Sequence, residues 1–250
     1  MFSLLKWIDQ VSSPKPLIKA ELDSNEYFAG QAIGLTIRLH PDPHKEYGLI
    51  QISAKLICEI SDHDDSFANK PFTLAEKTLE NQLFLNQQDT QDFYLFQLPF
   101  NCPCSGHSAK FSLVITATAE NNEQEQHTYP INIQLPELSQ AFINTLTYLG
   151  FEEDMCWFNH NKSFENHTFP YLQKFKYLNA TNPNLPDKMT VIFYFENFSD
   201  YVDIYMQVHA SNHSLQYNIS NHRFTVSHPN IEDSAVALLT FLQNQLTETV

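Results

Sequence analysis

Ile50-Gln-Ile-Ser-Ala-Lys-Leu-Ile-Cys-Glu-Ile60 is the most regular stretch of this sequence. Apolar side chains occupy every second position from Ile50 to Ile60, and polar side chains occupy most of the positions between them. Successive side chains of a β-strand point to opposite faces of a sheet, so this period of two predicts a strand with one buried face. The stretch is long enough to span a whole sheet.

The same alternation recurs through the first half of the chain. With 50–60 included, it predicts seven short strands at hairpin spacing, which is typical of a β-sandwich of the immunoglobulin size class. Two polar segments are predicted to be loops, an acidic one at 61–70 and a hairpin loop at 120–126. The other predicted strands cover residues 18–22, 33–39, 79–85, 92–100, 110–119 and 128–135.

The character of the sequence changes after Pro136. Apolar side chains at helical spacing predict a helix over Glu137–Tyr148, and Gly150 stands where a helix C-cap favours glycine. A second helix is predicted over 231–246. Residues 191–195 lack alternation, which predicts a strand buried on both faces. The strands predicted in this half cover residues 155–159, 169–178, 189–195, 201–209 and 215–226.

The charge balance limits the partners. The chain carries 29 acidic and 14 basic residues, a formal net charge of −15, and no cluster of Lys or Arg interrupts it. A nucleic-acid backbone or an anionic lipid surface would be repelled at long range, so we expect proteins or cations as partners and no nucleic acid. Only five glycines are present, which argues against Gly-rich phosphate-binding loops.

Nothing in the sequence predicts export or stable membrane insertion. Residues 1–9 lack the features of a signal peptide, and no stretch offers the ~18 consecutive apolar residues of a membrane helix. The four cysteines follow no disulfide spacing, which favours a reducing, cytoplasmic location. Phe2, Leu5 and Ile8 are spaced as on a short amphipathic helix, which either packs against the body of the protein or touches a membrane.

One cluster of soft metal ligands occurs, at Cys102-Pro-Cys-Ser-Gly-His107. Two thiolates and an imidazole suit Zn²⁺, so Cys102, Cys104 and His107 are the candidate ligands of a metal- or small-molecule-binding module. The usual Cys-x₂-Cys spacing and a fourth ligand are missing, and Pro99 and Pro103 are typical of a strand-ending loop. We therefore favour a loop without metal and expect no cofactor.

The remaining polar groups form no catalytic pattern. Histidines four residues apart, at His40/His44 and His209/His213, can share a metal only on a helix, which neither context predicts. The acidic residues at 62–65 lack the glycine and distal glutamate of a calcium-binding loop. No Gly-x-Ser-x-Gly, His-Glu-x-x-His or phosphate-cradling motif occurs, so we expect no catalytic residues and no enzyme.

Aromatic side chains and strand edges are the predicted binding features. Aromatic residues make up 13% of the chain, and ten of them gather between residues 169 and 205. Alternation places most of these in the core but turns others outward, where they would anchor a protein interface. Open strand edges offer a second route, through pairing with an extended segment of a partner. The sequence also leaves a homo-oligomer open.

Three stretches resemble the bacterial sporulation-control protein family, whose members look like arrestins. The most specific is Leu149-Gly-Phe151 followed by Phe169-Pro-Tyr-Leu-Gln-Lys-Phe-Lys-Tyr177, which is similar to the family's Pro-Phe-Val-Gln-Glu-Phe-Glu-Phe segment. The others are the opening hairpin at 18–37, with Gly30 in its turn, and Phe96-Gln-Leu-Pro-Phe-Asn-Cys-Pro103. Order and spacing match across nearly the whole chain, although residues 105–129 lack the family's acidic run.

The resemblance implies a mainly β, arrestin-like fold of two tandem β-sandwich domains with a few short helices. We place an N-terminal sandwich with a short N-terminal helix at residues 1–135. A C-terminal β-rich domain with flanking helices, either a sandwich or an α+β unit, follows at 136–250. The resemblance also implies a cytoplasmic adaptor or scaffold that acts in regulation through protein–protein interaction. The metal- or small-molecule-binding module is the alternative function.

Overall fold

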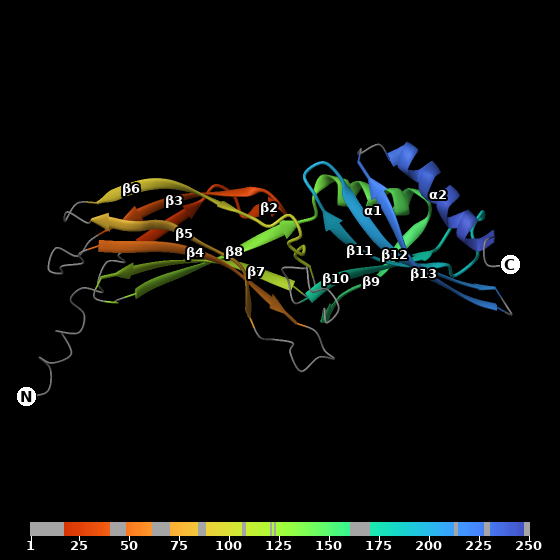
Figure 1. The fold of residues 1–250 in the computed structure, drawn as a ribbon, viewed down its shortest axis with the longest axis horizontal. Coiled ribbons are helices and arrows are strands. Elements are labelled where there is room, and N and C mark those ends of the chain that lie inside the picture. Colours follow the sequence, from red (N-terminus) through yellow and green to blue (C-terminus); the bar gives the residue numbers. More distant parts are fainter. Residues whose placement is uncertain are drawn as a thin grey trace, which may run out of the picture.

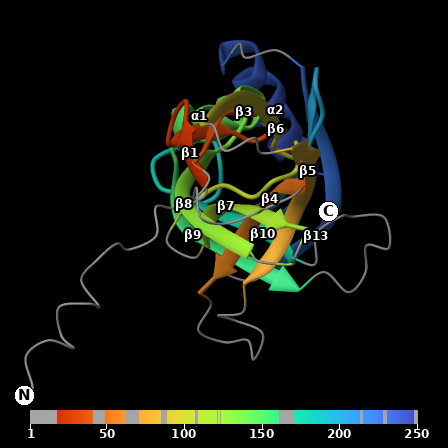
Figure 2. The same ribbon diagram turned by 90° about the vertical axis from the view of Figure 1, so that its left-hand side faces the viewer.

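The computed structural model shows two β-rich bodies arranged end to end along the long axis of the molecule (Figure 1). Strands β1 to β8 form the first body, and α1, β9 to β13 and α2 form the second. The first body has two layers, which Figure 2 shows with β1, β3 and β6 above β8, β7 and β4. The structure describes residues 18–40, 49–61, 71–84, 89–106, 109–120, 122, 124–160, 171–212, 215–227 and 231–247.

The first body is a sandwich of a three-stranded and a five-stranded sheet. All described strand pairs in it are antiparallel except β2 with β8, which are parallel. The three-stranded sheet has the order β1 (Ile18–Leu22), β3 (Ala32–Leu39), β6 (Thr90–Gln97). The five-stranded sheet has the order β2 (Glu26–Phe28), β8 (Gln124–Gln134), β7 (Ala109–Ala119), β4 (Leu49–Ile60), β5 (Phe72–Phe84).

Strand β4 confirms the alternation that opened the sequence. Ile50, Ile52, Ala54, Leu56 and Cys58 are completely buried between the two sheets. The inward side chains of β3 and β7 meet them there and complete one continuous core. Burying each Ile or Leu contributes about 1.5–3 kcal/mol, so the alternating strands themselves supply most of what holds the sandwich together.

The second body is a single antiparallel sheet covered by two helices. The apolar faces of α1 (Glu137–Tyr148) and α2 (Ile231–Thr247) pack on one side of this sheet through Phe142, Leu146, Leu238 and Leu242. Of the two arrangements left open for this half, the described residues therefore form the α+β unit, because helices occupy the face that a second sheet would cover. The sheet has the order β13 (Leu215–Val226), β12 (Val202–Asn212), β11 (Thr190–Asn197), β10 (Tyr171–Asn179), β9 (Phe151–His160).

Helix α1 begins directly after Pro136 and has the predicted bounds. Gly150 follows its C-cap with a φ of +84°, in the left-handed region where glycine is favoured, as predicted. The chain leaves β8 at Gln134, so only Leu135 and Pro136 connect the two bodies. Neither described helix is long and apolar enough to cross a membrane.

Several strand predictions need correction. Strand β5 begins at Phe72 and not at residue 79, and three register shifts against β4 explain why its alternation is hidden in the sequence. Strand β8 begins at Gln124, inside the predicted loop at 120–126, because pairing with β7 extends beyond the apolar residues. Residues 191–194 alternate between buried and half-buried and Phe195 is half-buried, since only one face of their sheet is covered by helices.

Candidate functional site at the junction of the two bodies

We call the region where the two bodies meet the junction. It surrounds the short connection from β8 to α1 (Figure 1). On the first body, the turn between β2 and β3 and the loop after β6 reach it. On the second body, α1, β9 and β10 face it. Two hollows lined by residues of both bodies lie here, so the junction is where a ligand or partner would contact both at once.

Gln173 on β10 joins the bodies through hydrogen bonds. Its Oε1 accepts a bond from the backbone N–H of Cys104 at 2.8 Å, and its Nε2 donates to the carbonyl oxygen of Cys104 at 3.2 Å. The same Nε2 donates to Sγ of Cys156 on β9 at 3.4 Å. The amide thus uses its acceptor and both donor hydrogens, and it holds the loop after β6 against the second body.

Further contacts fix the two bodies together. The backbone N–H of Asn197, at the end of β11, donates to Oδ1 of Asn101 at 2.6 Å. Within the second body, Ser139 on α1 donates its hydroxyl to Oδ1 of the same Asn197, in a buried position, and so holds Asn197 in place for its bond to Asn101. The ring of Tyr171 on β10 lies 5.2 Å from that of Phe72 on β5, measured between centroids. Polar and apolar contacts between the bodies therefore give the junction walls of defined shape.

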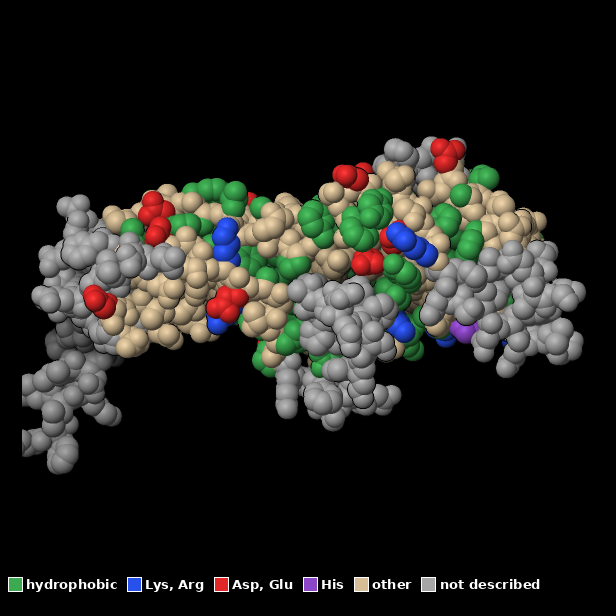
Figure 3. Space-filling view, in the orientation of Figure 1, with side chains coloured by type: hydrophobic (Ala, Val, Ile, Leu, Met, Phe, Trp, Pro, Cys, Tyr) green, Lys and Arg blue, Asp and Glu red, His purple; other side chains and the backbone are tan. Residues whose placement is uncertain are grey.

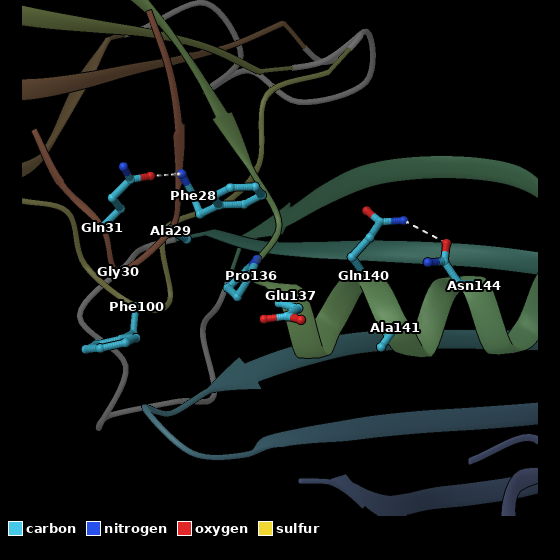
Figure 4. Close-up of a pocket in the computed structure, with 10 residues that line it drawn as sticks. All are labelled: Phe28, Ala29, Gly30, Gln31, Phe100, Pro136, Glu137, Gln140, Ala141 and Asn144. Atoms are coloured by element: carbon cyan, nitrogen blue, oxygen red, sulfur yellow. Dashed lines mark hydrogen bonds between the residues drawn. The ribbon is translucent and has the colours of Figure 1, made fainter. Parts of the chain in front are cut away.

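The cleft between the β2–β3 turn and α1 is the most apolar hollow of the junction (Figure 4). It has a volume of about 690 Å³. Phe28 and Phe100 stand on its sandwich side, with 50% and 44% of their surfaces exposed. Pro136, Glu137 and α1 form the opposite side. The lining comprises Phe28, Ala29, Gly30, Gln31, Phe100, Pro136, Glu137, Gln140, Ala141 and Asn144.

Gly30 allows the aromatic wall to form. Its φ of +82° lies in the left-handed region, and a Cβ placed there would stand 2.5 Å from Cδ1 of Phe100. The Phe100 ring therefore lies flat on a turn that only glycine can make at this distance. Gln31 completes the turn, because its Oε1 accepts a hydrogen bond from the N–H of Phe28 at 2.9 Å. The sequence singled out Gly30 through the hairpin resemblance but did not identify Phe28 or Phe100 as a binding surface.

The lining of this cleft is mostly apolar, with a few polar groups. Its lining combines two aromatic rings, small apolar groups, side-chain amides and one carboxylate, Glu137, in the first turn of α1. The amide of Gln140 donates to Oδ1 of Asn144 at 3.2 Å and thereby stays on the helix surface (Figure 4). These lining groups include no nucleophile beside a base. An apolar side chain flanked by a polar or basic group matches this surface.

The structure separates the predicted cysteine ligands into different cores. Cys102 is buried in the core of the sandwich, whereas Cys104 packs against the core of the second body. His107 lies outside the described residues. Within the described part of the chain, no group of three or more His, Cys, Asp or Glu side chains could hold a metal ion. Cys104 has Cys156 and Gln173 as its neighbours across the junction.

The thiols at the junction are held in their neutral form. Burial raises the pKa of the Cys104 thiol to about 11 and that of Cys156 to about 12. All four cysteines are free thiols, and burial likewise raises the pKa of Cys58 and Cys102. A thiol must ionise to act as a nucleophile, so the raised pKa lowers the reactivity of these side chains at neutral pH.

Of the other polar candidates, His40 and His209 belong to the described part of the chain, and neither lines the two hollows of the junction. Nδ1 of His40 lies 3.0 Å from Oδ2 of the exposed Asp89, at the end of the three-stranded sheet. His209 lies on β12. His44, His213, the acidic residues 62–65 and the predicted helix at 1–9 all fall outside the described residues.

The aromatic cluster of the second half divides between the two faces of its sheet. Phe175, Tyr177 and Phe193 are buried under the helices, as alternation predicts. Tyr194 and Tyr205 are only half-buried and stack with centroids 5.0 Å apart.

The fold and the junction define a mainly β protein with an arrestin-like fold, as predicted, in which an apolar cleft lies between two β-rich bodies. The family model described as SpoOM protein matches residues 6–211 of the chain, and the protein belongs to this Spo0M family.

Comparison with solved structures agrees with the family. The crystal structure of Spo0M, sporulation control protein, from Bacillus subtilis aligns with a TM-score of 0.70 at 15% identity, over 91% of this chain and 98% of that one. At that identity the likeness establishes the fold. A superoxide reductase (neelaredoxin) from Ignicoccus hospitalis covers 47% of this chain and 80% of its own at 12% identity, but its TM-score of 0.28 carries no argument. No curated protein sequence matches the chain.

Proposed function

We propose that this protein is a cytoplasmic regulatory adaptor that works by binding another protein and not by catalysis. Membership of the Spo0M family supports a regulatory role, and the solved relative from Bacillus subtilis is named as a sporulation control protein. A reducing, cytoplasmic compartment is supported by four free thiols in one chain. Sporulation control is accordingly the regulatory process that we propose for it.

The apolar cleft at the junction is the observation that carries the proposal. Exposed phenylalanine rings that face a helix across a cleft are typical of the anchors of protein interfaces. Covering the exposed half of each ring would contribute about 1–2 kcal/mol. Two such rings in one cleft therefore supply a useful part of the affinity of a transient complex.

The charges indicate which partner fits. Glu137 lies at the rim of the cleft, and the chain has a net charge of −15. A partner segment with an apolar anchor side chain followed by lysine or arginine would fill the cleft and meet this carboxylate. Long-range attraction would also speed the encounter of a basic partner with this chain.

Site-specific photo-crosslinking in the host cell tests the proposal. A benzoylphenylalanine placed at Asn144, which lines the cleft, should capture a defined protein, whereas the same group at the exposed Val236 on α2 should not. The captured protein, once purified, should bind the intact chain. Phe28→Ser should weaken this binding about tenfold, and Val236→Ser, on the exposed side of α2, should leave it unchanged.

The opposite outcomes are equally clear. Capture of the same proteins from both positions, or equal binding by Phe28→Ser and the unaltered chain, would show that the cleft is not the binding site. In a spore-forming host, Phe28→Ser is expected to change the yield of spores while Val236→Ser does not. Equal spore yields from both variants would show that the cleft has no role in sporulation control.

A further inference from the structure

A second hollow lies at the junction, beside the apolar cleft. It has a volume of about 640 Å³, and residues of both bodies line it. Gln140 on α1 lines both the cleft and this hollow. Glu137 lines the cleft, and Ile143, about 9 Å farther along the helix axis, lines the second hollow. A segment that crosses α1 at Gln140 therefore contacts both hollows.

Apolar groups form much of the wall of the second hollow. Ile143 on α1 and Leu135 from the connection between the bodies are half-buried. Phe158 on β9 and Phe175 on β10 are buried and complete this part of the lining. The methylene groups of a long side chain can pack against such a wall. The hollow therefore suits the stem of a long side chain.

Glu153 on β9 supplies a carboxylate to the lining of the second hollow. Its Oε2 accepts a hydrogen bond from the hydroxyl of Tyr177 at 3.2 Å. Burial, followed by the charge of Glu153, raises the pKa of Tyr177, so the phenol keeps its proton and leaves the carboxylate charge in place. The next residue, Asp154, differs because it already pairs with Lys176 at 2.6 Å.

Within the described part of the chain, Glu153 forms no ion pair. The described lining of the second hollow includes no Lys, Arg or His. The thiols of Cys104 and Cys156 in the same lining are neutral at pH 7, because burial raises their pKa to about 11 and about 12. A cationic group that enters the hollow therefore meets a free negative charge in its lining and no positive one.

We propose that the second hollow takes an arginine or lysine side chain of the partner that fills the cleft. This rests on the proposed function, since the side chain belongs to the segment whose apolar anchor lies between Phe28 and α1. Its stem packs on Ile143 and Leu135, and its charged end donates hydrogen bonds to Glu153. An extended segment spans the distance of about 9 Å in about three residues, so the anchor and this basic residue are about three positions apart.

The charge of the whole molecule favours a basic occupant. The chain has a net charge of −15. On the face drawn in Figure 3, Lys and Arg side chains lie only in small, separate groups. A basic segment is attracted at long range by such a molecule, whereas an acidic segment is repelled.

Small probes test the second hollow without the partner. In a titration of the full chain with millimolar N-acetyl-arginine amide, the backbone NMR signals of Cys104 and Cys156 should shift, because both residues line the hollow. N-acetyl-norleucine amide has a similar stem without the charge and should bind at least about fivefold more weakly. Glu153→Gln keeps an acceptor for the Tyr177 hydroxyl and should weaken binding of the arginine probe about fivefold. Glu152→Gln, exposed on the opposite face of β9, should leave it unchanged.

The purified partner from the cross-linking experiment gives the second measurement. Glu153→Gln should weaken its binding about fivefold, whereas Phe28→Ser tests the cleft alone. Equal binding of the two probes, or an equal effect of Glu153→Gln and Glu152→Gln, would overturn the proposal. A partner that responds to Phe28→Ser but not to Glu153→Gln would refute the second hollow and leave the cleft in place. Selective binding of the arginine probe with no captured partner would contradict the proposed function and uphold the hollow as a site for basic groups.

Discussion

Replacing Gln173 by leucine should loosen the junction between the two bodies. Leucine has a similar volume but can neither accept the N–H of Cys104 nor donate to its carbonyl oxygen. Both backbone groups of Cys104 are then left without their partner in a half-buried loop. The loss of the bond from Gln173 to Sγ of Cys156 is minor, because sulfur is a weak acceptor.

The structure sets the size of the effect. An unsatisfied buried backbone group costs about 1–3 kcal/mol, and Cys104 is only partly buried, so we expect about 2 kcal/mol for the pair of lost bonds. Every 1.4 kcal/mol corresponds to a factor of ten, so local opening of the loop should become about 30-fold more frequent.

Hydrogen exchange measures this opening directly. The amide of Cys104 should exchange about 30-fold faster in Gln173→Leu than in the unaltered chain. The amide of Ala29, which donates to the carbonyl of Gln134 within the first body, should keep its rate. Gln126→Leu, at an exposed position of β8, is the matched control. An unchanged rate at Cys104, or an equal acceleration in both variants, would show that Gln173 does not fasten the junction.

Other perturbations test the turn, the buried carboxylate and the thiols. Gly30→Ala should lower the free energy of unfolding by about 1–2 kcal/mol and displace Phe100, visible as a lower Tm, because alanine disfavours a positive φ. Burial alone would raise the pKa of Asp203, but hydrogen bonds, above all that from Arg223, lower it below the usual 3.8. The stabilising contribution of this carboxylate should therefore be full above about pH 4 and should be lost as acid protonates it in the folded chain. In acid denaturation, Asp203→Asn should flatten this dependence of stability on pH. Alkylation of Cys104 at pH 8, followed by mass spectrometry, should be about 100-fold slower in the folded chain than in urea, and equal rates would contradict a neutral buried thiol.

Much of the fold could be predicted locally. Alternation located β4 and its neighbour β7 because one buried face forces a period of two on the residues themselves. The bounds of α1 and the glycine after it followed from helical spacing and from the need for a left-handed residue. The polar start of β8 is a strand because it pairs with β7, and its own residues show no alternation that would predict one.

The candidate site could be predicted only in part from the sequence. Gln173 stood in the segment most similar to the sporulation-control family, but no local rule could show that its amide reaches Cys104, 69 residues earlier in the chain. The proposed ligands Cys102 and Cys104 are neighbours in sequence, yet the loop turns their side chains toward different cores.

The sequence by itself determined the β-rich class, the helices of the second half and the net charge of −15. Each of these depends on the order of residue types along the chain, or on their sum. Only the tertiary structure decided that Phe28 and Phe100 share a cleft with α1, and that β6 is an edge while β4 is central. Strand order and the meeting of distant loops depend on contacts between remote segments, which periodicity cannot encode.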